Sequence, residues 1–183
     1  MEKLDEKYTR ITSILAPFSG LSRISPAVLE NAANRGTRVH VAIDSIINGI
    51  GFDLDEEIAG YVESFEKWRG DKVFIPNPKR FYNDEHMITG EADAIYATTL
   101  VDFKTSAKEG SCWVHQGSAY CKMAHDAGYK IDKIEFVQLR KDGKVAKSYF
   151  YEYNFEEFLR LKNVYDKYFK TKQTQEEMDY EYI

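Results

Sequence analysis

The sequence predicts an α/β protein in which a mixed central sheet is flanked by helices. Two patterns lead to this class. Apolar residues recur at helical spacing up to about residue 70, over residues 111–127 and after residue 154. Apolar and polar residues alternate instead over residues 72–106 and 133–153, as they do in strands. Helices and strands that follow one another in this order favour a single α/β unit.

The first third of the chain is expected to be helical. A first helix covers Thr9–Phe18. A long second helix begins at Ser25 and Pro26, because serine is a preferred N-cap and proline is preferred at the first helical position. It is expected to end near Asn48. Gly36 lies inside it, and because such a glycine costs roughly 1 kcal/mol relative to alanine, it indicates close packing or a kink.

Three further helices are expected. One opens at Asp53, where acidic residues fill the first turn, and ends at Gly70. Another is capped by Ser111 and runs to about Ala127. The last begins after Asn154, which is again a preferred N-cap residue.

Two hairpins are expected between these helices. Ile88–Tyr96 and Leu100–Thr105 form the first, joined by Ala97–Thr99. Lys133–Arg140 and Val145–Tyr153 form the second, around an Asp-Gly turn signal. One domain is therefore expected over the whole chain.

This domain is expected to span residues 1–183, with a core over about residues 26–170 and a mobile tail over residues 171–183. A hydrophobic content of 43%, with 30% charged residues, is typical of a globular protein. Two cysteines imply no disulfide framework, and the charged N-terminus is unlike a signal peptide. No apolar run has membrane-spanning length, and a cytoplasmic location is expected because the cysteines form no disulfide framework.

Three charged residues are predicted to meet on the first hairpin. Asp102 and Lys104 share one face of their strand, and Val101 and Phe103 share the opposite face. If Asp93 projects on the same side as Asp102, two carboxylates and one ammonium form a single patch. Carboxylate oxygens are ligands for hard divalent cations such as Mg²⁺, and the backbone carbonyl of Phe103 is a candidate third oxygen ligand. The alternative is two acids on a solvated strand face.

The motifs in this region resemble a known family. Gly90-Glu-Ala-Asp93, Asp102-Phe-Lys104 and Gln116-Gly-Ser-Ala-Tyr120 match the GxxD, (D/E)xK and QxxxY pattern of the PD-(D/E)XK nuclease superfamily, in its order. The chain is most similar to the branch of RecB-like nucleases and phage and mitochondrial-type exonucleases. The resemblance implies a restriction-endonuclease-like αβββαβ core over about residues 32–153. It also implies a DNA exonuclease that uses Mg²⁺ or Mn²⁺.

Gln116 and Tyr120 are expected on the sheet-facing side of their helix. On a helical wheel they share one face with Cys112, Ala119 and Met123. A buried glutamine needs hydrogen-bond partners, so it either contacts the site or lies at the margin of the apolar stripe. The family resemblance implies that both residues hold DNA or a catalytic group.

His40 and two arginines are further candidates on the long helix. The resemblance implies that His40 is a metal ligand, and a nitrogen ligand would favour Mn²⁺ over Mg²⁺. The alternative is a packing histidine. Arg35 and Arg38 lie on the same helix and are predicted to contact phosphates, with plain surface charge as the alternative.

The third acidic ligand is an open question. Many relatives carry a glutamate on the strand before GxxD, whereas residues 72–80 contain none. Glu91 is a candidate further ligand or an acid that supports the ligands, and Glu63 and Glu66 are weaker substitutes.

Other cofactors are not expected. Cys112 and His115 point away from Cys121 and His125 on one helix, so these four side chains do not close a zinc tetrahedron. An iron–sulfur cluster needs four cysteines, and an ATP site needs a P-loop.

The expected partner is DNA, with no membrane. A recombination or single-strand-binding protein is a further partner that the resemblance implies, and an oligomer is compatible with the sequence. The resemblance also implies a role in phage recombination or DNA processing, in the host cytoplasm. The net charge of −5 counts against indiscriminate DNA binding. Two rivals therefore stay open: a non-catalytic DNA- or protein-binding module that keeps the fold, and a structure-specific endonuclease.

Overall fold

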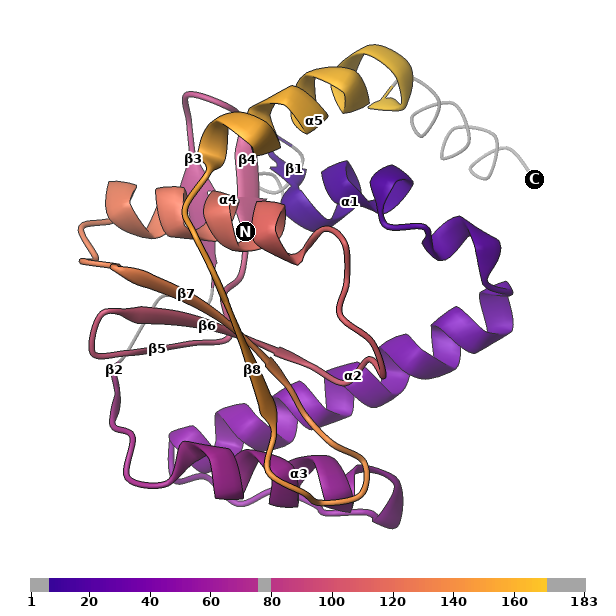
Figure 1. The fold of residues 1–183 in the computed structure, drawn as a ribbon, viewed down its shortest axis with the longest axis vertical. Helices are drawn as coiled ribbons and strands as arrows, with labels where there is room; N and C mark the ends of the chain where they lie inside the picture. The colour runs from indigo at the N-terminus through magenta and orange to yellow at the C-terminus, as the bar shows by residue number, and fades with distance from the viewer. Residues whose placement is uncertain (1–6, 76–79, 171–183) are drawn as a thin grey trace.

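The computed structural model describes residues 7–75 and 80–170 (Figure 1). The predicted mobile tail lies outside these residues. The helices are α1 (Ile11–Leu15), α2 (Pro26–Ile47), α3 (Glu56–Arg69), α4 (Trp113–Asp126) and α5 (Phe155–Tyr168), with short 3₁₀ turns at Ala16–Phe18 and Leu21–Arg23. The strands are β1 (Thr9–Arg10), β2 (Phe74–Ile75), β3 (Phe81–Asn83), β4 (Ile88–Gly90), β5 (Ala94–Tyr96), β6 (Thr99–Lys104), β7 (Lys133–Gln138) and β8 (Lys147–Tyr151).

The central sheet has the strand order β2-β5-β6-β7-β8. Strands β6 and β7 are parallel and are connected through α4, whereas every other neighbouring pair in this sheet is antiparallel. The predicted α/β class with a mixed central sheet is therefore confirmed. A second sheet of three short strands, in the order β1-β4-β3, was not predicted.

Helices cover both faces of the central sheet (Figure 1). Helices α2 and α3 pack on one face, while α4 lies on the other, together with α1 and α5. Strand β6 supplies both cores by alternation: Leu100 is buried on the α4 side, and Val101 and Phe103 on the α3 side. Asp102 and Lys104 thus share the face of Leu100, as predicted. Among the described residues, no helix is both long and apolar enough to cross a bilayer.

The long helix is confirmed almost to its predicted end. It begins with Ser25 as N-cap and Pro26 at the first position, although the Ser25 side chain makes no capping hydrogen bond. Gly36 lies within it without interrupting it. A Cβ atom there would lie 3.7 Å from Thr105 Oγ1, an ordinary van der Waals distance. The expectation that Gly36 reflects tight packing is therefore wrong, and the expectation of a kink stays a prediction.

Three other boundaries differ from the prediction. The segment Thr9–Phe18 is not one helix, because Thr9 and Arg10 pair with β4 before α1 begins. Helix α3 starts at Glu56 rather than at Asp53, because the carboxylate of Asp55 accepts the amide hydrogens of residues 57 and 58. The cap of α4 is Cys112 rather than Ser111. The cap at Asn154 is confirmed, since its side chain accepts the Glu157 amide.

The strand predicted over Ile88–Tyr96 is interrupted. Its first part is β4 of the small sheet, and its second part is β5 of the central sheet. At the junction, Gly90 lies against the ring of Tyr120, and a Cβ atom there would come within 2.4 Å of Tyr120 Cε1. The chain therefore crosses from one sheet to the other immediately before Asp93, which places this residue beside the central sheet.

Candidate functional site

Asp93 is held between α2 and β6 as the chain enters β5. Its Oδ1 atom lies 2.8 Å from Nδ1 of His40, and its Oδ2 atom accepts the backbone N–H of Phe103 at 2.5 Å. The negative charge of Asp93 raises the pKa of His40 to about 9, against the opposing effect of burial. The imidazole of His40 is therefore protonated at neutral pH, and the two residues form an ion pair.

Asp102 and Lys104 form a second ion pair on the neighbouring strand. The Lys104 ammonium lies 2.6 Å from Asp102 Oδ1. Asp102 is only 3% exposed, and burial raises its pKa to about 6 although Lys104 opposes this shift. Asp93 also raises the pKa of Asp102 through its negative charge, so the two carboxylates interact. Each of these two carboxylates thus has one cationic neighbour.

Gln116 connects the ion pair of Asp102 and Lys104 to helix α4. Its Oε1 atom accepts a hydrogen bond from Lys104 at 3.1 Å. Its Nε2 group lies 3.3 Å from Asp102 Oδ2 and 2.9 Å from the Tyr120 hydroxyl. The predicted sheet-facing side of this helix is confirmed, since Gln116 and Tyr120 are both buried. A buried amide with three partners is fully engaged, so Gln116 is not a marginal residue of the stripe.

Tyr120 lies below the site rather than at its surface. Its side chain is buried under β4, and burial raises the pKa of its phenol. Its hydroxyl contacts Gln116, so its place in the structure is behind the charged residues. The predicted contact of Tyr120 with DNA stays a prediction.

The remaining predicted residues make their contacts outside the charged cluster of His40, Asp93, Asp102 and Lys104. Glu91 is half-exposed and pairs with Arg80. Arg35 lies over the ring of Tyr61 in α3, with 5.9 Å between the guanidinium carbon and the ring centroid. Arg38 pairs with Asp55, at 2.7 Å, and with a second acid at the start of α3. Both arginines therefore face α3, and the structure does not bring them to the charged cluster.

Glu63 and Glu66, the two substitute ligands, also make their contacts outside the charged cluster. Glu63 pairs with Lys67, and Glu66 pairs with Arg69 at 3.2 Å, both within α3. Within the residues the structure describes, no three His, Cys, Asp or Glu side chains gather into a metal-binding group. Asp93 and Asp102 are instead paired with His40 and Lys104.

The donor set nevertheless fits a hard divalent cation. Asp93 and Asp102 offer carboxylate oxygens, the Phe103 carbonyl lies on the same strand, and His40 offers a nitrogen once it loses its proton. Binding there requires that a metal replace the protons and cations that now neutralise the acids.

A groove of about 1010 Å³ opens beside this cluster. Its walls are one face of α2, the strand β2 and residues 91–94, and both His40 and Asp93 line it. Asp44 lies in the same wall, one helical turn after His40. The sequence reasoning missed Asp44, although its i, i+4 spacing from His40 was a usable signal.

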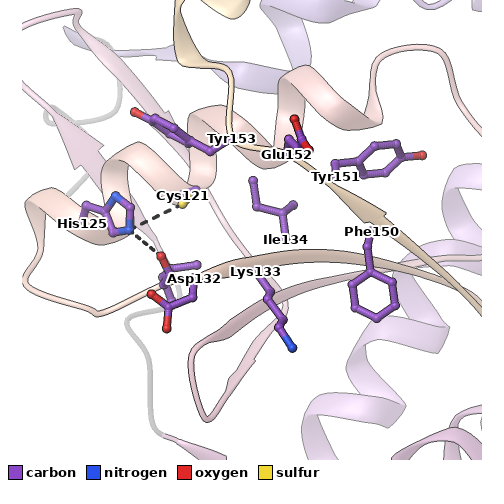
Figure 2. A pocket seen from close by; sticks show the side chains of 10 residues that line it. Cys121, His125, Asp132, Lys133, Ile134, Phe150, Tyr151, Glu152 and Tyr153 are labelled. Carbon is purple, nitrogen blue, oxygen red and sulfur yellow. Dashed lines mark hydrogen bonds between the residues drawn. The ribbon is translucent and has the colours of Figure 1, made fainter.

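A second cavity, of about 530 Å³, lies between α4 and the strands β7 and β8. Figure 2 shows Cys121, His125 and Tyr153 on one side of this cavity, with Phe150 on the opposite side. His125 Nε2 lies 2.9 Å from the carbonyl of Ile131 and 3.7 Å from Cys121 Sγ. None of the predicted site residues lines this cavity, so it is separate from the charged cluster.

Comparison with known protein families and with curated proteins finds no match to this chain. The function is therefore inferred from the geometry of the residues and from the motifs that they form.

Proposed function

We propose that this protein is a divalent-metal-dependent deoxyribonuclease of the PD-(D/E)XK superfamily, and that it acts as an exonuclease. The observation that carries the proposal is the convergence of three separate motifs. Asp93, Asp102, Lys104 and Gln116 come from three segments of the chain and form one interacting set with His40. The resemblance to the PD-(D/E)XK superfamily assigns two acids, a lysine and a glutamine at these positions to metal-dependent phosphodiester hydrolysis, in which the metal activates water and stabilises charge.

Asp93, Asp102 and the Phe103 carbonyl would hold Mg²⁺ or Mn²⁺, with His40 as a nitrogen ligand. When bound, the metal supplies positive charge to the phosphate and lowers the pKa of a water molecule. The protein orients its ligands for this task. The backbone N–H of Phe103 and the imidazole of His40 fix both oxygens of Asp93, and Lys104 and Gln116 fix those of Asp102.

Lys104 is the proposed catalytic cation. Its ammonium lies between Asp102 and Gln116, at the surface of the buried network, and its side chain is 23% exposed. From this position it orients the attacking water and stabilises the charge that develops on the phosphate oxygens. Gln116 restrains the ammonium, and Tyr120 restrains Gln116 in turn.

The test is cleavage of linear DNA labelled at one end, with and without Mg²⁺ or Mn²⁺. We expect the label to be released as short products only when metal is present. A closed circular DNA of the same sequence should stay intact, because an exonuclease needs an end. Cleavage of the circle would assign the endonuclease rival, and no cleavage with either metal would remove the nuclease function.

A non-catalytic binding module is the second candidate function. It is favoured by one observation, namely that His40 and Lys104 already neutralise the two acids in this structure. Such a module would bind DNA or a protein without a metal requirement. The proposed nuclease, by contrast, would work in the cytoplasm on DNA during recombination or processing, together with a recombination or single-strand-binding protein.

A further inference from the structure

We propose that two copies of this chain associate through strand β8, which pairs with the β8 strand of the second copy in antiparallel orientation about a two-fold axis at Tyr149. The two five-stranded central sheets then form one continuous sheet. The proposal goes beyond the nuclease function and does not depend on it. It assigns a partner to the edge of the sheet and to the cavity beside this edge, neither of which belongs to the charged cluster.

Strand β8 forms an edge of the central sheet (Figure 1). Within the described part of the chain it pairs with β7 alone, from Lys147 opposite Gln138 to Tyr151 opposite Ile134. One row of its backbone N–H and C=O groups therefore points away from the sheet, where another strand can pair with it. The strand at the opposite edge, β2, has two residues, whereas β8 has five. The longer edge is the better template for a further strand.

The sequence of β8 favours pairing. Edge strands commonly avoid association by carrying charged residues or proline. In β8 the single charged residue, Lys147, is at the first position, and the last three residues are the aromatic Tyr149, Phe150 and Tyr151. Aromatic residues are enriched in paired strands. Phe150 is 62% exposed, so a second strand would bury a large apolar side chain that now faces water.

The side chains of β8 complement those of a second β8 strand. With the two-fold axis at the middle residue, Ser148 lies opposite Phe150 of the second copy, and the two Phe150 rings are diagonal neighbours within reach of each other. Lys147 lies opposite Tyr151, whose hydroxyl is 2.5 Å from the carboxylate of Glu109. The ammonium of each copy thus meets an aromatic ring and an acid of the other copy. This complementarity of charge favours a second copy as the partner.

The cavity between α4, β7 and β8 lies at the end of the same edge (Figure 2). Glu152 and Tyr153, which follow β8, line it, and Tyr153 is 48% exposed. When the register continues past the strand, Val145 of the second copy lies opposite Tyr153. Val145 is itself 58% exposed. Association therefore covers two exposed apolar side chains beside the cavity and extends the contact beyond the strands.

The size of this contact predicts a dimer that dissociates on dilution. A stable interface of standard size uses roughly 20–30 residues of each partner. The five residues of β8 and their immediate neighbours are fewer than that. We therefore expect monomers at low micromolar concentration and dimers at high micromolar concentration.

The first test is sedimentation equilibrium of the wild-type protein from about 1 μM to about 500 μM. We expect the average mass to rise from the 21.2 kDa of one chain toward twice this value. Amide hydrogen exchange in β8 should slow over the same range, because new hydrogen bonds protect its outer N–H groups. A mass of one chain at every concentration would overturn the proposal, and so would a dimer whose β8 amides exchange as fast as those of the monomer.

The second test places a charge on the edge. Phe150→Lys should raise the dissociation constant of the dimer about tenfold or more, because it removes the apolar contact and brings two cations together. Val28→Lys is the matched control, since Val28 lies on α2 and is 57% exposed. Circular dichroism should show that both variants keep the fold. Equal dissociation constants for the two variants would overturn the proposal.

The third test exchanges the charges that the register brings together. Lys147→Glu should weaken the dimer about tenfold, because it places an acid beside Glu109 of the second copy. Adding Glu109→Lys to this variant should restore most of the affinity, since opposite charges then meet again. A double variant as weak as Lys147→Glu alone would overturn the antiparallel pairing about Tyr149.

Discussion

Helices α2 and α4 lie on opposite faces of the central sheet, and each places one polar side chain, His40 or Gln116, against the charged cluster. Helix α4 buries its contribution: Gln116 is 8% exposed, and Asp102, which it contacts, is 3% exposed. Helix α2 leaves its contribution open, with a His40 side chain that is 36% exposed at the edge of a groove. The two helices thus build one site from a closed half and an open half.

The difference indicates that the closed half fixes the geometry of its residues, whereas the open half is accessible to a ligand. In the closed half, Asp102 is paired with Lys104 and contacts Gln116, which in turn contacts Lys104 and Tyr120, so much of the cost of burying Asp102 and Gln116 is offset and their geometry is fixed. In the open half, one ion pair between His40 and Asp93 meets solvent, and a ligand can reach it. The following predictions test this division, from the largest expected effect to the smallest.

The largest effect is expected in the closed half. Asp102→Asn and Lys104→Ala should each reduce DNA cleavage by about 10²–10³-fold or more, because the first removes a proposed metal ligand and the second removes the cation proposed to act on the reacting phosphate. Circular dichroism should show an unchanged fold. Asp132→Asn, in the second cavity, is the control and should cleave at the wild-type rate. Full activity of the Lys104 variant would remove the catalytic role of this half.

The open half should respond to pH. In metal-free protein, NMR titration should give His40 a pKa near 9, and Asp93→Asn should return it toward 6.5, because the charge of Asp93 causes the shift. The folded state then binds this proton more tightly than the unfolded state. The ion pair therefore contributes fully to stability below pH 6.5, and the contribution is lost as pH rises through 9. A wild-type pKa near 6.5 would contradict the ion pair.

A smaller effect is expected for Gln116 and Tyr120, which support the charged residues of the closed half. Tyr120→Phe removes the hydroxyl that contacts Gln116, whereas Gln116→Leu removes the contacts to Asp102 and Lys104 as well. We expect the rate of cleavage to fall about tenfold in the first variant and about 10²-fold in the second. DNA affinity should change little in Tyr120→Phe, because this side chain is buried. A loss of affinity without a loss of rate would show that Tyr120 contacts DNA.

The smallest effects concern two glycines next to the two halves. Gly90→Ala should destabilise the protein by about 1–3 kcal/mol, because the new Cβ would lie 2.4 Å from the Tyr120 ring. Gly36→Ala should stabilise it by about 0.5–1 kcal/mol, because its nearest neighbour is 3.7 Å away and alanine favours a helix. Urea unfolding measures both, and equal values for the two variants would contradict this packing.

Much of the closed half could be predicted from local sequence. The alternation of a strand places Asp102 and Lys104 on one face, and the period of a helix places Gln116 and Tyr120 on another. Both periods are properties of the element alone, so they are visible without any tertiary contact. The mixed α/β class followed from the same patterns.

The open half and its surroundings could not be predicted in the same way. At the break before Asp93, Gly90 lies against the ring of Tyr120, which is a contact between distant segments. The direction of Arg38 depends on Asp55 at the start of α3, and so on how two helices pack. The groove itself exists only because α2 lies beside β2. None of these features leaves a periodic signal in the sequence.

Metal binding tests the central claim most directly, because the claim is that the two halves meet at one divalent cation. Isothermal calorimetry with Mn²⁺ at neutral pH should show binding to the wild-type protein, with proton release as His40 gives up its proton. Asp93→Asn and Asp102→Asn, one from each half, should both lose this binding, while Asp132→Asn should keep it. Mn²⁺ binding that survives either site substitution, or no binding to the wild type, would contradict the account.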